Sequence, residues 1–198
     1  GKIDVLVNNA SAMWWFPVEK TDARRYDLVN GVNARGTYLL SRECIPHMPS
    51  RSHIITHSPP IDSNAMDLYL NQGMIKNKVG YMVSKLGMSI VASGLAQELK
   101  DRSISSNCIW PKTAIGTAAM KDNPLIPQSM NNPTLWRTED IIGDMVAELV
   151  QEPADFTNQF LIDETYLRSK GYTDFKKYRC DPEVEPPSLT ELFQFSNK

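Results

Sequence analysis

Cysteine is scarce in this sequence, and the cysteines that it has are widely spaced. There are three, an odd number, and none belongs to a Cys-x-x-Cys pair: Cys44, Cys108 and Cys180. Free and mostly buried thiols in a reducing, intracellular compartment are therefore expected. The histidines fall between positions 47 and 57, but no cysteine or carboxylate stands beside them at metal-ligand spacing. We therefore expect no metal site.

Long apolar runs and blocks of one charge are also missing. The 21 basic and 23 acidic residues give a net charge of −2, and the basic residues are scattered. This pattern favours neither nucleic acid nor a membrane surface as a partner. No apolar run approaches the roughly 18 residues that a membrane span needs. The first residue is Gly1, no signal peptide is visible, and a strand-like segment starts at once, as if the chain began inside a domain.

What is present is an ordinary globular composition in which strand and helix patterns alternate. The 198 residues are 41% hydrophobic, which fits one domain. Buried strands are predicted at residues 3–8, 53–57, 104–110 and 160–163. Helices are predicted from Thr21 or Asp22 to about 42, over 81–100 and over 138–151, with a mobile loop that contains short helical pieces at 111–137. The alternation argues for an α/β domain with a parallel sheet and right-handed crossovers.

Tyr81 and Lys85 carry the clearest chemical signal. They are four residues apart at the start of a predicted helix, so both side chains lie on one face. An ammonium beside a phenol favours the phenolate, which predicts a lowered Tyr81 pKa and a proton donor or acceptor at a substrate oxygen. Ser58 follows a predicted strand, at the sheet edge where ligands bind in α/β folds, and its hydroxyl could hold the same oxygen.

Several of these residues also have plainer interpretations. A second Tyr-x-x-x-Lys pair, Tyr172 and Lys176, lies in a polar segment without a preceding strand-end serine, and we interpret it as coincidental. Ser58 can equally be a turn residue before two prolines. Other residues can have purely structural roles: Asn8 and Asn9 as a strand turn, Trp14 and Trp15 as packing aromatics, and Met120 and Met130 as apolar filler of a loop.

The order of these motifs resembles the short-chain dehydrogenase/reductase family. The resemblance covers about residues 1–180 and follows, in order, Asn8-Asn9-Ala10-Ser11, Asn33, Ser58, Tyr81-x-x-x-Lys85 and Pro111-Lys112-Thr113. Several stretches are similar to the hydroxysteroid dehydrogenase-like proteins, some of which carry a sterol-carrier domain. The string Trp110-Pro111-Lys112-Thr113-Ala114-Ile115 is the most specific, because most of the wider family has Pro-Gly there.

The resemblance implies a role for each matching residue. Tyr81 is the proton donor or acceptor, and Lys85 holds the nicotinamide ribose and tunes Tyr81. Ser58 orients the substrate oxygen, and Asn33 supports a proton-relay water through the backbone of its helix. The remaining implied contacts are with the cofactor: Asn8, Asn9 and Ala10 on its adenosine and ribose side, and Pro111 and Thr113 on the nicotinamide carboxamide.

Two departures from the family pattern stand out. No glycine-rich turn that leads into a pyrophosphate-binding helix occurs anywhere in the chain. The expected fold is therefore a partial Rossmann-type, doubly wound parallel sheet: residues 1–180 form a catalytic region without its first βαβαβ half, and 181–198 form a linker or tail. Ser58 and Tyr81 are also 23 residues apart, more than is usual in the family, so residues 62–78 contain an insertion that either loops out or displaces Ser58.

The resulting hypothesis is an oxidoreductase that moves a hydride between NAD or NADP and an alcohol or carbonyl, on a lipid- or steroid-like small molecule. The alternative is a catalytically inactive truncated isoform or fragment that acts as a binding or dimerising module. Because the strand at residues 3–8 lacks the half of the fold that should cover its edge, the chain is expected to self-associate as a homo-oligomer. The family resemblance implies an intracellular location, in peroxisomes or mitochondria.

Overall fold

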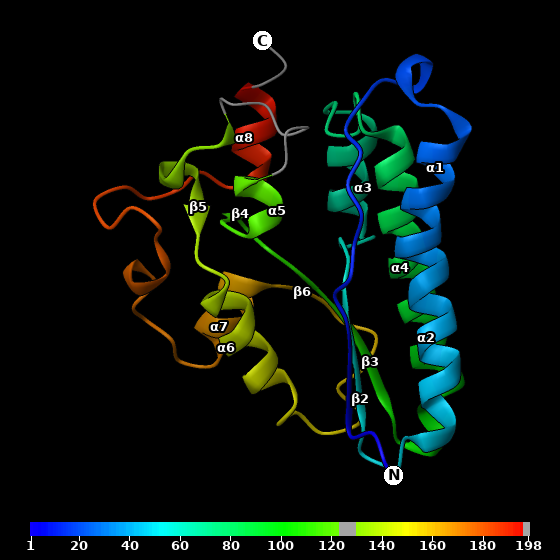
Figure 1. Ribbon diagram of the computed structural model, residues 1–198. Coiled ribbons are helices and arrows are strands. Elements are labelled where there is room, and N and C mark those ends of the chain that lie inside the picture. The colour runs from blue at the N-terminus through cyan, green and yellow to red at the C-terminus, as the bar shows by residue number, and fades with distance from the viewer. Residues whose placement is uncertain (123–129, 196–198) are drawn as a thin grey trace. The chain divides into compact units, whose positions relative to one another are not determined.

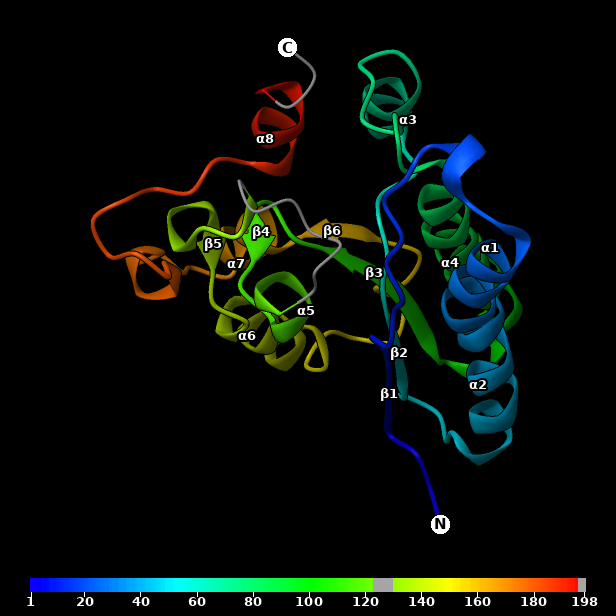
Figure 2. The same cartoon turned by 45° about the horizontal axis from the view of Figure 1, so that its top comes forward.

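The computed structural model describes residues 1–122 and 130–195, and they form two compact units (Figures 1 and 2). The first unit comprises residues 1–66, 75–110 and 150–161. The second comprises residues 67–74, 111–149 and 162–198. Each unit is described by itself below.

A parallel sheet forms the centre of the first unit. Its strands are β1 (Val5–Asn8), β2 (His53–His57) and β3 (Ser105–Trp110), followed at the end of the sheet by β6 (Phe160–Ile162). The pairs β1–β2 and β2–β3 are parallel and continuous in register. Parallel strands need crossovers, and each of these strands is followed by a segment long enough to supply one. The predicted α/β fold and its four strands are confirmed.

Helices cover one face of this sheet. They are α1 (Ala23–Asn30), a π-helical turn (Gly31–Arg35), α2 (Gly36–Cys44) and α4 (Val79–Glu98), and Figures 1 and 2 show them side by side. The Asp22 side chain accepts the Arg25 N–H and so caps α1, as predicted. Where the sheet meets these helices, Leu6 and Ile54 pack with Leu95 and neighbouring apolar side chains. The helices therefore fix the positions of both the strand ends and the α4 side chains.

Strand β1 is less buried than its sequence suggests. Leu6 and Asn8 are buried, but Val5 and Val7 are 39% and 40% exposed. The expectation of a buried strand is therefore confirmed for the face that carries Leu6 and Asn8, and it is wrong for the face that carries Val5 and Val7. Among the described strands β1 pairs with β2 alone, and the helices of this unit cover the face that carries Leu6.

The segment between Ser58 and Tyr81, which is predicted to contain an insertion, folds in part as helix α3 (Ser63–Leu70). Asp62 begins it, because its carboxylate accepts the N–H groups of Asn64 and Ala65. Short 3-10 turns complete the local structure elsewhere: Val18–Lys20, Ile45–His47, Lys100–Arg102, Pro133–Leu135 and Lys176–Tyr178.

The second unit contains short elements. Strands β4 (Ala114–Ile115) and β5 (Trp136–Arg137) pair in parallel, and the helices are α5 (Ala118–Lys121), α6 (Asp140–Leu149), α7 (Asp163–Ser169) and α8 (Leu189–Phe195). Trp136, Ile141, Met145 and Leu167 are buried. Residues 111–137 are predicted as a loop with short helical pieces, and α5 and the 3-10 turn Pro133–Leu135 are such pieces. The short strands β4 and β5 are not predicted. Residues 123–129 lie outside the described residues.

Helix α4 is the one described helix that is long and apolar enough, by length and composition, to cross a membrane. This criterion is weak, because the core helices of globular domains also meet it. About 44% of its apolar window is buried inside the structure, and α4 packs against β2 and β3.

Candidate active site

Two side chains of helix α4 form hydrogen bonds with the main chain at the end of β2 and just after it. The Lys85 side chain is 3% exposed, and its ammonium donates a hydrogen bond to the main-chain oxygen of His57. One turn further along, the Ser89 hydroxyl donates to the main-chain oxygen of Pro59 at 2.6 Å. These two bonds lie on either side of Ser58 in the sequence. They fix the strand end that carries Ser58 against the helix that carries Lys85.

Asn33 ties a third segment to the same helix. It lies in the π-helical turn, is fully buried, and its side-chain oxygen accepts the N–H of Ala12 at 2.7 Å. Its amide group donates to the Ala12 carbonyl at 3.0 Å and to the Ser84 hydroxyl at 2.8 Å. Ser84 in turn donates to the main-chain oxygen of Tyr81 at 2.6 Å. Asn33 therefore joins the loop after β1 to the first turns of α4, and single π-turns of this kind are frequent at functional sites.

A glycine allows this close approach of the helices. A Cβ atom placed on Gly87 would lie 2.8 Å from the Cβ of Ala34, closer than real side chains pack. Without a side chain at Gly87, the π-helical turn can lie directly against α4. This contact keeps Asn33 within hydrogen-bond distance of Ser84.

At the end of β1, Asn8 is buried, whereas Asn9 and Ala10 are exposed to solvent. Asn8 is 4% exposed, donates to the Ser41 hydroxyl at 3.1 Å, and leaves its side-chain oxygen buried without a partner. Asn9 and Ala10 are exposed, and the Asn9 oxygen lies 3.0 Å from Nδ1 of His57. Burial and, next, the Lys85 charge lower the pKa of His57 to about 3. The imidazole is therefore neutral, and Nδ1–H donates to Asn9.

Ser58 is closed off from solvent. It is fully buried, its N–H donates to the carbonyls of Thr56 and Ile109, and its hydroxyl lacks a hydrogen-bond partner of normal geometry. The nearby Cys108 thiol has its pKa raised by burial to about 11, and the Ser58 hydroxyl moderates that rise. The structure therefore places the hydroxyl in the interior, whereas the predicted role, holding the same substrate oxygen as Tyr81, requires the hydroxyl to be accessible.

Tyr81 has a largely apolar environment. Its ring meets the edge of the Trp15 ring at a centroid distance of 5.9 Å, and its hydroxyl makes no hydrogen bond to the described residues. Burial raises the Tyr81 pKa above its ordinary value, and burial lowers the Lys85 pKa to about 8. The predicted lowering of the Tyr81 pKa is therefore wrong for this structure. The Lys85 ammonium instead bonds the His57 carbonyl and lies 5.5 Å from the centroid of the Trp110 ring.

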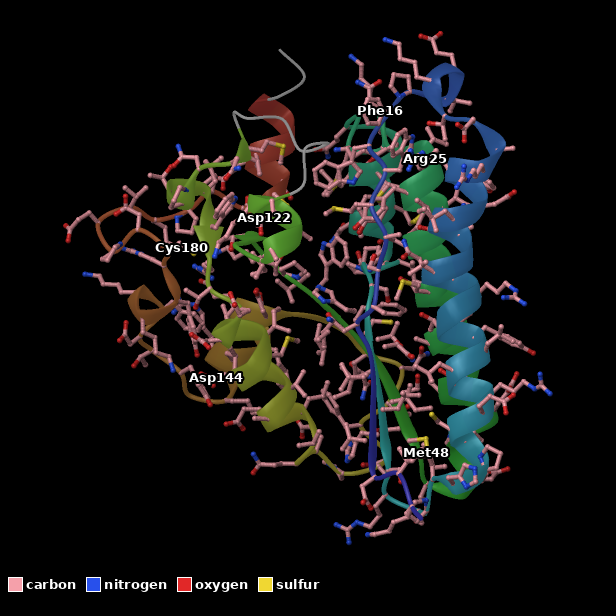
Figure 3. All side chains as sticks on the ribbon, in the orientation of Figure 1. Phe16, Arg25, Met48, Asp122, Asp144 and Cys180 are labelled. Carbon is pink, nitrogen blue, oxygen red and sulfur yellow. The ribbon has the colours of Figure 1, made fainter. Side chains whose placement is uncertain are left out.

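Further aromatic and basic side chains surround Trp15. The Lys78 ammonium lies 5.8 Å from the Trp15 ring centroid, and burial lowers its pKa to about 8. The neighbouring Trp14 ring stacks at 4.6 Å on Phe16 and at 4.6 Å under the guanidinium of Arg25; Figure 3 labels both of these partners. The aromatic segment therefore meets the predicted proton donor and has two cations beside it.

Pro111 and Thr113 belong to the second unit and are both buried. Between them, the Lys112 N–H donates to a carboxylate oxygen of Asp163 at 2.9 Å. Thr113 forms an antiparallel bridge with Ser188. Their roles toward a cofactor stay predictions.

The sequence-based prediction omitted two residues that hold this site together. Ser84 stands between Tyr81 and Lys85 and links Asn33 to the helix. His57 supplies the carbonyl for Lys85 and a ring contact to Asn9. Ser84 could have been identified from sequence, because a serine three residues after Tyr81 in a helix can bond the Tyr81 carbonyl. The contacts of His57 could not, because they depend on the strand register. Within residues 1–122 and 130–195, no group of three or more metal-ligating side chains is present.

Sequence comparison assigns residues 1–159 to the family profile described as enoyl-(acyl carrier protein) reductase. Among curated proteins, the chain is 40% identical over 195 residues to hydroxysteroid dehydrogenase-like protein 2 of Xenopus tropicalis, covering 98% of this chain and 43% of that protein. The human protein of that name is 39% identical, with coverages of 92% and 41%. The chain thus spans less than half the length of these relatives.

Solved structures agree with this family and fold. A short chain dehydrogenase from Mycobacterium thermoresistibile superimposes with a TM-score of 0.81 at 36% identity, covering 95% of this chain and 64% of that one. The angucycline C-6 ketoreductase LanV with bound NADP gives a TM-score of 0.65 at 23% identity, covering 82% and 61%. At that lower identity, the second match supports the fold alone.

Proposed function

Because the chain belongs to the short-chain dehydrogenase/reductase family, we propose that it carries the catalytic residues of an NAD(P)-dependent oxidoreductase acting on an alcohol or carbonyl. The observation that carries the proposal is the joining of three segments on α4. The Lys85 ammonium bonds the end of β2, and Asn33 bonds both the loop after β1 and Ser84. Ligands of open α/β sheets bind at this carboxyl edge.

In the proposed chemistry the cofactor supplies the hydride transfer, and residues of the protein bind the cofactor. The nicotinamide gives or takes a hydride when it is bound. Asn8, Asn9 and Ala10 would hold the adenosine and ribose side, Lys85 the nicotinamide ribose, and Pro111 and Thr113 the carboxamide. The unpartnered side-chain oxygen of Asn8 and the exposed Asn9 fit a polar ligand, because buried orphan atoms are otherwise costly.

Tyr81 would move the proton. Its raised pKa keeps the phenol protonated near neutral pH, so it is ready to donate to a carbonyl oxygen as reduction proceeds. The Lys85 charge would stabilise the phenolate left behind. Asn33 supports the proton-relay water through the backbone of its helix, and Ser58 orients the substrate oxygen once its hydroxyl is uncovered.

The substrate proposed is a lipid- or steroid-like ketone or alcohol, and the proposed location is the peroxisome or mitochondrion. The curated relatives are named hydroxysteroid dehydrogenase-like, which supports this substrate class. The aromatic segment beside Tyr81 offers apolar surface for such a molecule. A fluorescent fusion of the natural full-length protein, imaged with organelle markers, would test the location.

The deciding experiment is a reductase and dehydrogenase assay on the natural full-length protein. NADPH and NADH would each be offered with aliphatic and steroid ketones, and NADP and NAD with the matching alcohols. Turnover that is lost in Tyr81→Phe, with cofactor affinity retained, is the expected result. Absence of both cofactor binding and turnover in the full-length protein would reject the proposal.

The second candidate is a non-enzymatic binding or dimerising module. It is favoured by the exposed Val5 and Val7 side chains on strand β1. Exposed apolar strands of this kind promote association between chains. Association without any cofactor binding would select this candidate.

A further inference from the structure

The C-terminal segment 179–189, here called the strap, is fastened to the second unit at both ends. At its start, Arg179 forms an antiparallel bridge with Arg137 of β5. At its end, Ser188 forms an antiparallel bridge with Thr113, and the Leu189 N–H donates to the main-chain oxygen of Lys112 at 2.7 Å. The expected linker or tail is therefore ordered along this part of its length.

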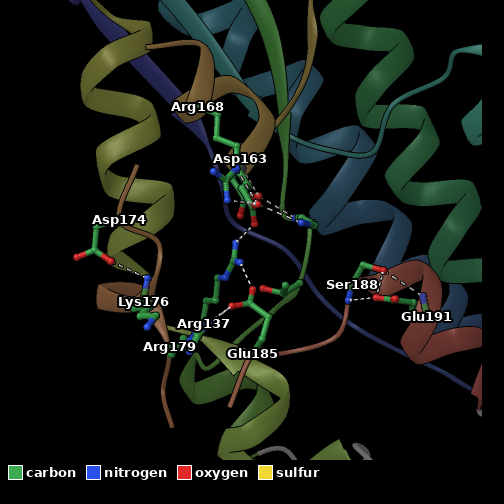
Figure 4. Close-up of polar contacts among 12 residues, drawn as sticks. Arg137, Asp163, Arg168, Asp174, Lys176, Arg179, Glu185, Ser188 and Glu191 are labelled. Atoms are coloured by element: carbon green, nitrogen blue, oxygen red, sulfur yellow. Dashed lines mark hydrogen bonds and ion pairs between the residues drawn. The ribbon is translucent and has the colours of Figure 1, made fainter. Parts of the chain in front are cut away.

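A buried arginine holds the middle of the strap (Figure 4). The Arg137 side chain is fully buried, and one of its terminal nitrogens lies 2.6 Å from Glu185 of the strap. Its other terminal nitrogen lies 2.6 Å from Glu164 at the start of α7. Arg179 pairs with the second oxygen of Glu185. A buried guanidinium is costly without its partners, so Glu185 is tied to this position.

The same network holds the peptide groups of Lys112 from two directions. Its N–H donates to Asp163 at 2.9 Å, and its carbonyl accepts the Leu189 N–H from the strap. Asp163 is itself fixed, because the same carboxylate oxygen accepts the Glu164 N–H at 2.6 Å. The Lys112 ammonium lies 3.1 Å from Glu164. The main chain of Lys112 is therefore held by two hydrogen bonds and its side chain by an ion pair. The strap supplies one of the two hydrogen bonds, through the Leu189 N–H.

We propose that the strap is a positioning device for the loop Pro111–Thr113, with Glu185 and the Leu189 N–H as its positioning groups. The inference rests on the proposed function, in which this loop contacts the nicotinamide carboxamide. A carboxamide presents one donor group and one acceptor, so a loop that binds it must hold its own peptide groups in one orientation. A loop ordered beforehand avoids the entropy cost of ordering on binding. The strap, although far in sequence from the proposed catalytic residues, would thus help to determine the affinity for the cofactor.

Two variants each remove one interaction that holds the strap in place. Leu189→Pro deletes the N–H that bonds Lys112, and proline suits this place because Leu189 is the first residue of α8. The preceding Ser188 lies in a bridge, where the extended backbone that proline demands is already present. Glu185→Gln keeps the shape and removes the charge that faces Arg137. Glu183→Gln is the control, since Glu183 is an exposed strap residue without a side-chain contact in the described part of the chain.

The measurements are hydrogen exchange at Lys112 and NADPH and NADH binding followed by fluorescence, all on the natural full-length protein. Leu189→Pro and Glu185→Gln should each speed exchange of the Lys112 amide and weaken cofactor binding about tenfold, the change expected for loss of one well-formed interaction. Exchange in α4 and the Glu183→Gln control should match wild type. Circular dichroism checks that the variants are folded; if one is not, the other decides.

The outcomes separate the two hypotheses. Faster loop exchange with unchanged cofactor affinity overturns the positioning role and leaves the proposed function standing. Unchanged exchange in both variants shows that the strap does not hold the loop, and also overturns the inference. Failure of the wild-type full-length protein to bind either cofactor rejects the proposed function, and the positioning role with it.

Discussion

Tyr81 and Lys85 illustrate how far single residues can be interpreted from sequence. Their spacing places them on one helical face, and the structure puts both on α4. Their pKa values depend on neighbours that spacing does not reveal. The ring of Trp15 meets Tyr81, and the carbonyl of His57 takes the Lys85 ammonium. Both residues are therefore shifted toward their uncharged forms by burial.

Tyr81→Phe in the natural full-length protein should lower turnover by about two to four orders of magnitude, which is the usual contribution of a general acid or base. Cofactor affinity should persist, because the aromatic ring and its contact with Trp15 are retained. Steady-state kinetics and cofactor titration measure the two effects. Tyr172→Phe is the matched control, since it belongs to the other Tyr-x-x-x-Lys pair and loses only a contact with Glu148. Turnover close to wild type in Tyr81→Phe would remove Tyr81 from the mechanism.

Asn33→Ala should destabilise the chain by roughly 2–4 kcal/mol, because it removes three hydrogen bonds that a fully buried side chain makes to the Ala12 peptide groups and the Ser84 hydroxyl. Urea denaturation gives the free energy of unfolding. Asn30→Ala is the control at the end of the adjoining helix α1, where one hydrogen bond to the Tyr26 carbonyl is lost, and about 0.5 kcal/mol or less is expected. Equal losses in the two variants would show that Asn33 does not join the segments as described.

At the scale of elements, the regular segments could be predicted because their patterns are local. Strand β2 has the predicted bounds, and α4 begins two residues before its predicted start. The π-helical turn around Asn33 could not be predicted, because it depends on the contact between Gly87 and Ala34 across two helices. The strap was interpreted as a tail because its prolines and charges are typical of linkers. Its fastening depends on Arg137, which is distant in sequence.

Helix α7 begins with a carboxylate whose state should govern stability in acid. Glu164 is buried to 6% exposure; burial raises its pKa, but hydrogen bonds from Arg137, Arg168 and Lys112 outweigh burial and lower it to about 2. A depressed carboxyl pKa adds stability above the unfolded value near 4.5, and that stability is lost as the pH falls toward 2.

Glu164→Gln should therefore reduce the stability difference between neutral and acid pH. Urea denaturation of wild type and variant across this range would measure it, with Glu183→Gln as the control on an exposed carboxylate. The difference between wild type and Glu164→Gln should shrink as the pH falls from about 4.5 to about 2. A difference that stays constant with pH would mean that the ionised Glu164 does not stabilise this unit.

At the scale of the whole molecule, the family could be identified from a few ordered motifs, but the arrangement that makes them work could not. Motif order survives in sequence, and the family match over residues 1–159 agrees with it. The burial of Ser58 is different, since it depends on how β2 and β3 pair and on the nearby Cys108 thiol. The exposure of Val5 and Val7 likewise depends on which elements cover the face of β1 opposite Leu6.

Residues 1–198 alone should associate and should bind nicotinamide cofactors weakly or not at all. Among the described strands β1 pairs with β2 only, and Val5 and Val7 are exposed beside its unpaired edge, which invites strand addition by another chain. The chain also has no glycine-rich turn and helix to hold a pyrophosphate, the group that such helix termini bind. Size-exclusion with light scattering and fluorescence titration with NADPH and NADH would measure both properties.

The double variant Val5→Thr and Val7→Thr keeps β-branched side chains and should reduce association, whereas Val18→Thr, at an exposed position outside the sheet, should not. A monodisperse wild-type monomer with micromolar cofactor affinity would show that these 198 residues need no further segment for binding.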